Sequence, residues 1–196
     1  PEFVKTVLRC FSPKAKAVLD PFGGTATTAF VAGEQRLKAY FCEVNPVMQF
    51  IFEVKAKVRL MDSKSRQDLS NRLIKLNTDI PRRLDGLPPD KNLLSRYERT
   101  FGASSFFDEM VLDQVLKART FIDELDSSDL IVAQLLTVAV LSSLIPCSRL
   151  QRAGDLRYKN GKELNKGIPP FLNTVTTKFS EIIEDIRSEN GGLLAK

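Results

Sequence analysis

Two carboxylates and a pair of glycines near the amino terminus have the spacing of a small-molecule binding site. Asp20 ends a short apolar run, and the segment continues Pro21-Phe22-Gly23-Gly24-Thr25-Ala26-Thr27-Thr28. This order predicts a strand, a tight turn and a helix start, which bring backbone close to a ligand and expose amide N–H groups. Glu43 lies 23 positions after Asp20, at the end of a second apolar run. An acid at about that spacing holds ribose hydroxyls in α/β nucleotide folds.

The turn lacks the patterns that bind pyrophosphate, since neither G-x-G-x-x-G nor G-x-x-x-x-G-K-[ST] occurs. It resembles the D-P-F-x-G-S-G-T-T motif of amino-group DNA methyltransferases, which make N4-methylcytosine or N6-methyladenine. Gly23 falls at the free position of that motif, and Ala26 stands where the family usually has glycine. Because alanine favours negative φ, we expect the turn to differ there. The segment Glu43-Val44-Asn45-Pro46 resembles the family's second motif, an acid closing strand 2 followed by Asn-Pro.

The resemblance implies that the cofactor is S-adenosylmethionine. Asp20 and the Gly23-Gly24 backbone would contact its methionine part, and Glu43 would accept hydrogen bonds from the ribose hydroxyls. Phe22 and Val44 would flank the adenine. Taken singly, Asp20-Pro21 also fits a strand-ending turn, Gly23-Gly24 a flexible loop and Glu43 an exposed strand end. The full implied cofactor set is Asp20, Pro21, Phe22, Gly23, Gly24, Thr25, Thr27, Thr28, Glu43, Val44 and Asn45.

The expected fold is α/β, a Rossmann-like S-adenosylmethionine-dependent methyltransferase fold with a partial sheet and a large helical insertion. Periodicity predicts helices over 3–11, 27–33 and 45–60, with strands at 17–19 and 37–43 and Gly33 stopping the second helix. Asn45 is the expected N-cap and Pro46 the first helical residue of the third. The four expected parts are a cofactor-binding half (1–61), a helical insertion between strands 2 and 3 (62–146), a basic loop (147–168) and a helix returning to the catalytic half (169–196).

Within the insertion, helices are expected over 63–78, 104–123 and 128–145, with a loop at 86–89. The run from Leu130 to Ile145 is apolar but shorter than the roughly 20 residues that cross a bilayer, so we expect a buried helix and no membrane partner. A last helix is expected over 169–189, ended by Gly191-Gly192.

Basic side chains concentrate between Cys147 and Lys166, where six Lys or Arg face two acids, 6 − 2 = +4, in a chain of net charge +5. Such cations pair with phosphates, and an interleaved tyrosine can stack on a base. An exposed, solvated loop is the plain alternative. The residues expected to contact double-stranded DNA are Arg149, Arg152, Arg157, Tyr158 and Lys159.

The family's catalytic motif, [DNS]-P-P-[YFW], is missing. The one Pro-Pro-aromatic run is Ile168-Pro169-Pro170-Phe171, in which Ile168 has no side-chain acceptor, so we interpret it as a helix start and assign no catalytic residue. We therefore expect a fragment or one half of a split enzyme, with residues missing upstream and the catalytic half or a restriction subunit as partner.

Composition narrows the chemistry further. The chain has no histidine and three dispersed cysteines without a C-x-x-C pair, which excludes the common zinc sites and Ser-His or Cys-His catalysis. Free cysteines and the lack of a signal peptide favour a reducing cytoplasm, and the family resemblance implies a prokaryotic one. The family resemblance implies a site-specific DNA methyltransferase of a restriction–modification system, acting without metal. A non-catalytic DNA-binding or assembly subunit and an RNA methyltransferase are the alternatives.

Overall fold

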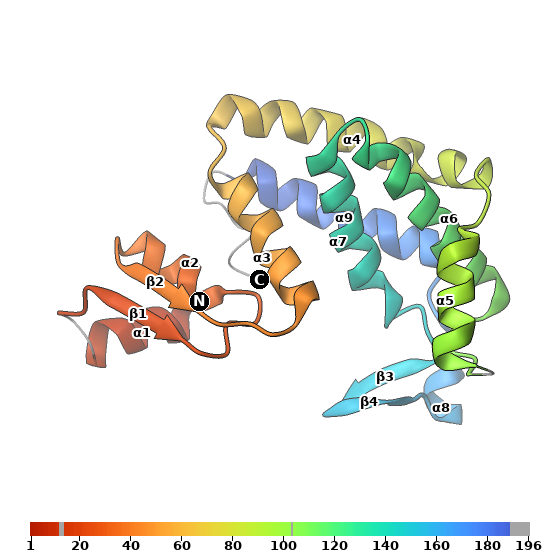
Figure 1. Cartoon of the computed structure of the whole chain (residues 1–196), viewed down its shortest axis with the longest axis horizontal. Helices are drawn as coiled ribbons and strands as arrows, with labels where there is room; N and C mark the ends of the chain where they lie inside the picture. The colour runs from red at the N-terminus through yellow and green to blue at the C-terminus, as the bar shows by residue number, and fades with distance from the viewer. Residues whose placement is uncertain (12–13, 103, 189–196) are drawn as a thin grey trace. The chain divides into compact units, whose positions relative to one another are not determined.

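The computed structural model describes residues 1–11, 14–102 and 104–188. The chain divides into two compact units, Pro1–Arg66 with Asp185–Lys196, and Gln67–Glu184. The structure is mixed α/β and about 65% helical. Its strands form one parallel and one antiparallel pair (Figure 1). The α/β class is therefore confirmed, at a coarser level than the Rossmann-like fold expected from the sequence.

The first unit is built around two parallel strands joined by a helix. Strands β1 and β2 pair in register from Ala17 opposite Lys38 to Asp20 opposite Phe41. A parallel pair needs a crossover connection, which α2 supplies, and α2 packs against both strands. The elements in chain order are α1 (Glu2–Phe11), β1 (Ala17–Asp20), α2 (Thr27–Glu34), β2 (Lys38–Phe41) and α3 (Pro46–Arg59).

The core of the first unit is small. The Phe52 ring of α3 lies against Phe30 of α2 and Phe41 of β2, with ring centroids 5.4 and 4.5 Å away. At the helix surfaces, Glu34 forms ion pairs with Lys5 at 3.2 Å and Arg59 at 3.5 Å. These contacts hold α1, α2 and α3 around the strand pair.

The boundaries of the helices and strands in this unit agree only partly with those predicted from the sequence. Asn45 caps α3 as expected, because its Oδ1 accepts the Val47 N–H at 2.9 Å and Pro46 is the first helical residue. The expected stop at Gly33 is wrong: α2 runs to Glu34, and the left-handed residue after it is Arg36, with φ 58°. Strand β2 is also shorter than the expected 37–43.

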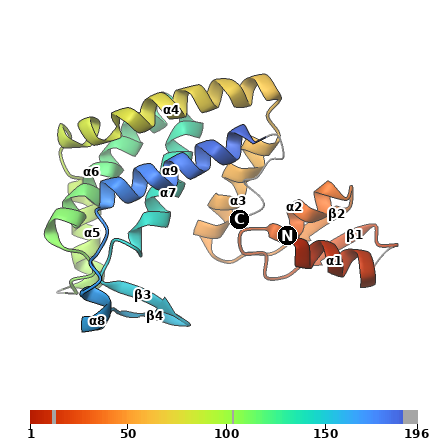
Figure 2. The same ribbon diagram turned by 180° about the vertical axis from the view of Figure 1, so that it is seen from behind.

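The second unit is a helical bundle with a hairpin at one end. Figures 1 and 2 both show α4 running beside α9, and the Asn77 side chain of α4 donates to the Thr176 carbonyl and to Ser180 Oγ of α9. Helix α6 packs along α7. The elements are α4 (Ser63–Asp85), α5 (Lys91–Phe101), α6 (Glu109–Asp126), α7 (Leu130–Leu144), β3 (Leu150–Ala153), β4 (Asp155–Tyr158), α8 (Gly161–Leu164) and α9 (Phe171–Arg187).

Large apolar side chains fill this bundle. Phe121, Phe171 and Phe179 are at most 1% exposed. Helix α7 buries seven of its 15 residues, and its largely apolar sequence predicts a helix that packs in the core. Among the described residues, no helix is long and apolar enough to cross a membrane.

Helices α4 and α5 differ from the sequence expectation. Helix α4 continues to Asp85 through Pro81, because Ile80 and Leu84 are buried on either side of the proline and packing outweighs the lost backbone hydrogen bond. Helix α5 was not expected at all. It begins at an Asp90 N-cap, whose carboxylate accepts the N–H groups of Asn92 and Leu93.

The segment 147–168, expected to be a long loop, contains strands β3 and β4 and helix α8. Strands β3 and β4 pair antiparallel from Leu150 opposite Tyr158 to Ala153 opposite Asp155, with Gly154 at φ 83° in the turn. These strands pair only with each other in the described chain, so they do not extend the parallel sheet. The expected stop at Gly191-Gly192 lies outside the described residues.

Candidate functional site

The first motif forms a tight loop between β1 and α2 that stays bonded to the end of β2. The Cys42 N–H donates to the Asp20 carbonyl at 3.0 Å, and the Gly23 N–H donates to the Cys42 carbonyl at 2.9 Å. The Asp20 carboxylate accepts the Phe22 N–H at 3.1 Å, which closes the first turn of the loop. Parallel pairing therefore continues beyond the strands and fixes the loop at their carboxyl ends.

Glu43 joins the two motifs. Its Oε2 accepts the Gly24 N–H at 2.7 Å, across 19 positions of sequence, and its Oε1 accepts the Asn45 N–H at 2.7 Å. Both are short hydrogen bonds to an ionised acceptor, the stronger kind in proteins. The carboxylate is thus held over the glycine turn, and each oxygen keeps a lone pair for a further donor.

Two features of the loop were not predicted from the sequence. One is a close contact at Gly23, and the other is a left-handed backbone conformation at Ala26. A Cβ added at Gly23 would lie 2.7 Å from Phe41 Cδ2, so this position, free in the family motif, requires glycine here. Ala26 is fully buried with φ 60°, in the left-handed region that favours glycine. The expectation that Ala26 would change the turn is wrong, because the alanine adopts the left-handed conformation despite its strain.

The start of α2 faces this loop without a side-chain cap. Ala26 is the N-cap residue and makes no side-chain hydrogen bond to the first turn, although its own carbonyl accepts the Phe30 N–H. Uncapped amides and the helix dipole favour a negative group at a helix start. The loop thus offers N–H donors from α2 and carboxylate acceptors from Asp20 and Glu43.

The side chains expected to flank an adenine are open to solvent. Phe22 is 88% exposed and Val44 is 96% exposed, at the ends of the two strands. A cavity of about 290 Å³ in this unit is lined by residues of α2, β2 and α3 and includes none of the motif residues. Phe22 and Val44 therefore lie on the surface of the first unit.

Three of the five residues expected to contact DNA are engaged within the second unit. Arg149 pairs with Asp108 and donates to Ser105 Oγ at 3.1 Å. Arg157 forms a two-pronged pair with Glu163, at 2.8 and 2.7 Å. Lys159 Nζ donates to the carbonyls of Pro146 and Ser148, at 3.0 and 2.7 Å, which closes the base of the hairpin.

The Arg157–Glu163 pair has a measurable electrostatic signature. The Arg157 guanidinium, together with the Asn160 N–H, lowers the pKa of Glu163 to about 2. The same carboxylate completes the capping box of α8 with Asn160. The remaining two expected DNA contacts, Arg152 and Tyr158, are exposed on the hairpin.

The Pro-Pro-Phe run opens α9, as the sequence indicated. The Thr174 N–H donates to the Pro170 carbonyl in the first turn, and Phe171 is 1% exposed in the core of the bundle. A ring in this position cannot stack on a substrate base. Within the described ranges, no three metal-ligating side chains gather into a possible metal site.

The sequence patterns did not reveal one set of residues. Tyr97, Phe101, Phe106 and Phe107 gather with Tyr158 around a second cavity. The available signal was three phenylalanines within 101–107, beside serine and glycine and outside any regular apolar period.

No protein-family model matches this sequence, and comparison with curated proteins and with solved structures also gives no match. The assignment of the site therefore rests on the motifs and their geometry.

Proposed function

We propose that this chain provides the cofactor-binding part of an S-adenosylmethionine-dependent DNA methyltransferase that acts on an exocyclic amino group of cytosine or adenine. The first unit would hold the cofactor, and the cationic hairpin of the second unit would contact DNA. The chemistry needs a positioned methyl donor and an unstacked base, and no metal. The described residues include no acceptor motif for the target amino group, so that role is not assigned to any of them.

The observation that carries the proposal is the hydrogen bond from the Gly24 N–H to Glu43 at 2.7 Å. Two motifs separated in the sequence meet at the carboxyl ends of adjacent parallel strands, where open α/β sheets bind ligands. A ribose diol reaching Glu43 would place the rest of the ligand over the glycine turn. The uncapped start of α2 then suits the methionine carboxylate.

Calorimetric titration tests this arrangement with S-adenosylmethionine and, separately, with adenosine. Glu43→Gln removes the charge that holds the loop and the ribose, so it should weaken both ligands by at least about tenfold. Asp20→Asn should weaken S-adenosylmethionine and leave adenosine unchanged, because the resemblance places Asp20 at the methionine part.

Asp90→Asn is the matched control. The Asp90 carboxylate also accepts two backbone N–H groups at a helix start, at 2.8 and 2.9 Å, but in the second unit. It should leave both ligand affinities unchanged. A folded chain that binds neither ligand contradicts the proposal, as does equal loss in all three variants.

A non-catalytic DNA-binding subunit is the second candidate, and the burial of Phe171 favours it. With that ring in the core, the Pro-Pro-Phe run offers no stacking surface to a target base. This candidate predicts DNA binding that is unaffected by S-adenosylmethionine, measured by fluorescence anisotropy of labelled DNA with and without the cofactor.

A further inference from the structure

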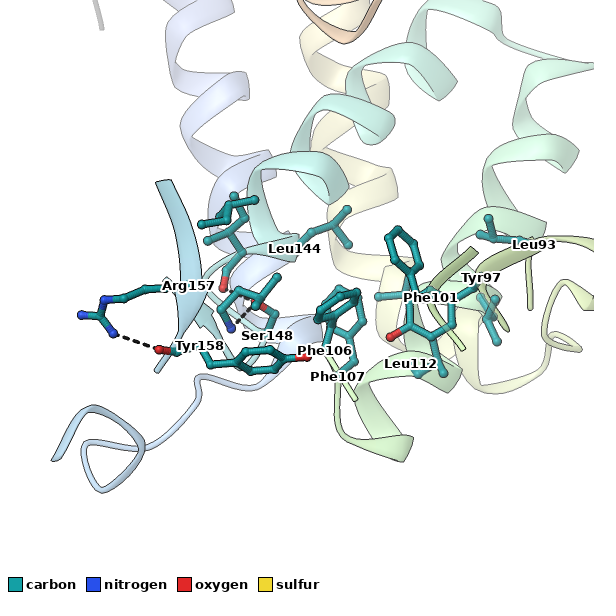
Figure 3. Close-up of a pocket in the computed structure, with 15 residues that line it drawn as sticks. Leu93, Tyr97, Phe101, Phe106, Phe107, Leu112, Leu144, Ser148, Arg157 and Tyr158 are labelled. Atoms are coloured by element: carbon teal, nitrogen blue, oxygen red, sulfur yellow. Dashed lines mark hydrogen bonds between the residues drawn. The ribbon is translucent and has the colours of Figure 1, made fainter. Parts of the chain in front are cut away.

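The second unit contains a cavity of about 570 Å³ with mainly apolar walls, where α5, the start of α6, the end of α7 and the β3–β4 hairpin meet (Figure 3). Five aromatic side chains line it: Tyr97, Phe101, Phe106, Phe107 and Tyr158. Pockets of this size and composition are typical of ligand sites.

The rings form a connected group that is partly exposed to solvent. Tyr158 stacks on Phe106, with ring centroids 5.8 Å apart and planes at 29°. Phe101 meets Phe106 edge-on at 5.1 Å. Tyr158 and Phe101 nevertheless remain 51% and 45% exposed, so the cavity presents aromatic surface to solvent.

The wall that carries Tyr158 is cationic. Between positions 149 and 166, and with Asp108 included, six cations face three carboxylates, 6 − 3 = +3. Asp108 and Glu163 are already paired with Arg149 and Arg157. In the described structure, Arg152, Lys162 and Lys166 are exposed and form no ion pair.

The hairpin is held rigidly against the aromatic wall. The Arg149 N–H donates to the Phe106 carbonyl at 2.7 Å, and the Lys159 N–H donates to the Arg149 carbonyl at 2.8 Å. Together with the Arg149–Asp108 pair, these bonds fix Tyr158 relative to Phe106. The stacking surface and the cations are therefore parts of one preformed site.

We propose that this cavity holds an unstacked base of a nucleic-acid strand whose phosphates lie along the hairpin. The inference deepens the proposed function and rests on its nucleic-acid partner. Aromatic platforms beside a cationic groove are how proteins hold single strands, and every base has a face that can stack. The apolar walls suit the faces of the base, while its polar edge would face the open mouth and the Tyr158 hydroxyl.

The site should therefore discriminate by base pairing. A base in a perfect duplex must leave its stack and its partner before it can enter, at a cost of a few kcal/mol. An unpaired base has no such cost. Fluorescence anisotropy with one labelled oligonucleotide, as a single strand, a perfect duplex and a duplex with one unpaired thymine, measures the difference. We expect the first and third to bind at least about tenfold more tightly than the perfect duplex.

Three variants separate the base site from the phosphate contacts. Tyr158→Leu keeps an apolar wall but removes the stacking ring, and it should abolish the preference for unpaired bases. Tyr158→Phe should retain that preference. Arg152→Gln with Lys162→Gln should weaken all three nucleic acids alike and reduce the salt dependence of binding.

Tyrosine fluorescence provides a second measurement of strand binding at the cavity. The chain has three tyrosines and no tryptophan. In Tyr40→Phe the emission arises from Tyr97 and Tyr158 alone, both at the cavity, and the single strand should quench it. Thermal melting followed by circular dichroism shows whether each variant folds.

Equal affinity for all three nucleic acids, or an unchanged preference in folded Tyr158→Leu, overturns the inference. Competition by free thymidine monophosphate as strong as by the strand shows a nucleotide site, and also overturns it. A dimer that Tyr158→Leu dissociates would show that a second copy covers the cavity. S-adenosylmethionine titration of Tyr158→Leu keeps the two proposals apart, since cofactor binding should be unchanged whichever result the nucleic acids give.

Discussion

The two units differ in how they use apolar side chains. The first unit leaves Phe3 and Phe11 80% exposed and Phe22 88% exposed, whereas the second buries Phe121, Phe171 and Phe179 almost completely. The first unit is instead organised by backbone hydrogen bonds around Gly23, Gly24 and Glu43. The first unit, which carries the recognisable motifs, therefore has the smaller hydrophobic core. The second unit, which carries no such motif, has the larger one.

The cysteines give the largest expected difference between the units. Cys10 and Cys42 are exposed in the first unit, while Cys147 is buried in the second, where desolvation raises the pKa of its thiol. Because Cys147 must be exposed by unfolding to react, we expect its labelling to be slower by about a thousandfold or more. An Ellman assay should count two fast thiols in the native chain and three in urea. Three fast thiols in the native chain would mean that the second core is open.

Phenylalanine truncations compare the cores directly. Phe179→Ala should lower the free energy of unfolding by about 3–5 kcal/mol, since it removes a fully buried ring. Phe3→Ala should change that free energy by less than about 0.5 kcal/mol. Urea titration followed by circular dichroism measures both. A comparable loss for Phe3→Ala would show that the ring is covered in solution.

Glycine replacements test the backbone network of the first unit. Gly23→Ala brings a methyl group to 2.7 Å from the Phe41 ring and should destabilise by about 1–3 kcal/mol. Gly33→Ala is the matched control. It lies in α2 with open space around its Cβ and should stabilise by about 0.5 kcal/mol. Thermal melting measures whether each variant is stabilised or destabilised. An unchanged melting temperature in Gly23→Ala would contradict the close contact between position 23 and the Phe41 ring.

The smallest effect concerns the Arg157–Glu163 pair. Because the pKa of Glu163 is lowered in the folded chain, its pair contributes stability above the ordinary pKa near 4.5. That contribution is lost as the pH falls from there through about 2. The melting temperature of the wild type should exceed that of Arg157→Gln by a constant amount above pH about 5 and converge toward pH about 2. A constant difference throughout would assign the effect of Arg157 to packing alone.

The sequence predicted most where the signals are local. Asn45-Pro46 placed the start of α3, whereas the hydrogen bond between Glu43 and the Gly24 N–H, which spans 19 positions, was not predicted. Prediction from the sequence failed where contacts between residues far apart in the chain determine the structure. Pro81 lies inside α4 because buried neighbours hold it there, and the charged hairpin lacks apolar alternation. The aromatic cavity joins Phe101 and Phe106 to Tyr158, a proximity that no local pattern encodes.

The double hydrogen bond of Glu43 has an energetic consequence for any ligand at the first motif. The carboxylate is already oriented, and the Gly24 and Asn45 amides already have their acceptor. A ligand that uses the remaining lone pairs would not have to order the loop, so less conformational entropy would be lost on association. Affinity at the first motif would then depend on preorganisation more than on buried area.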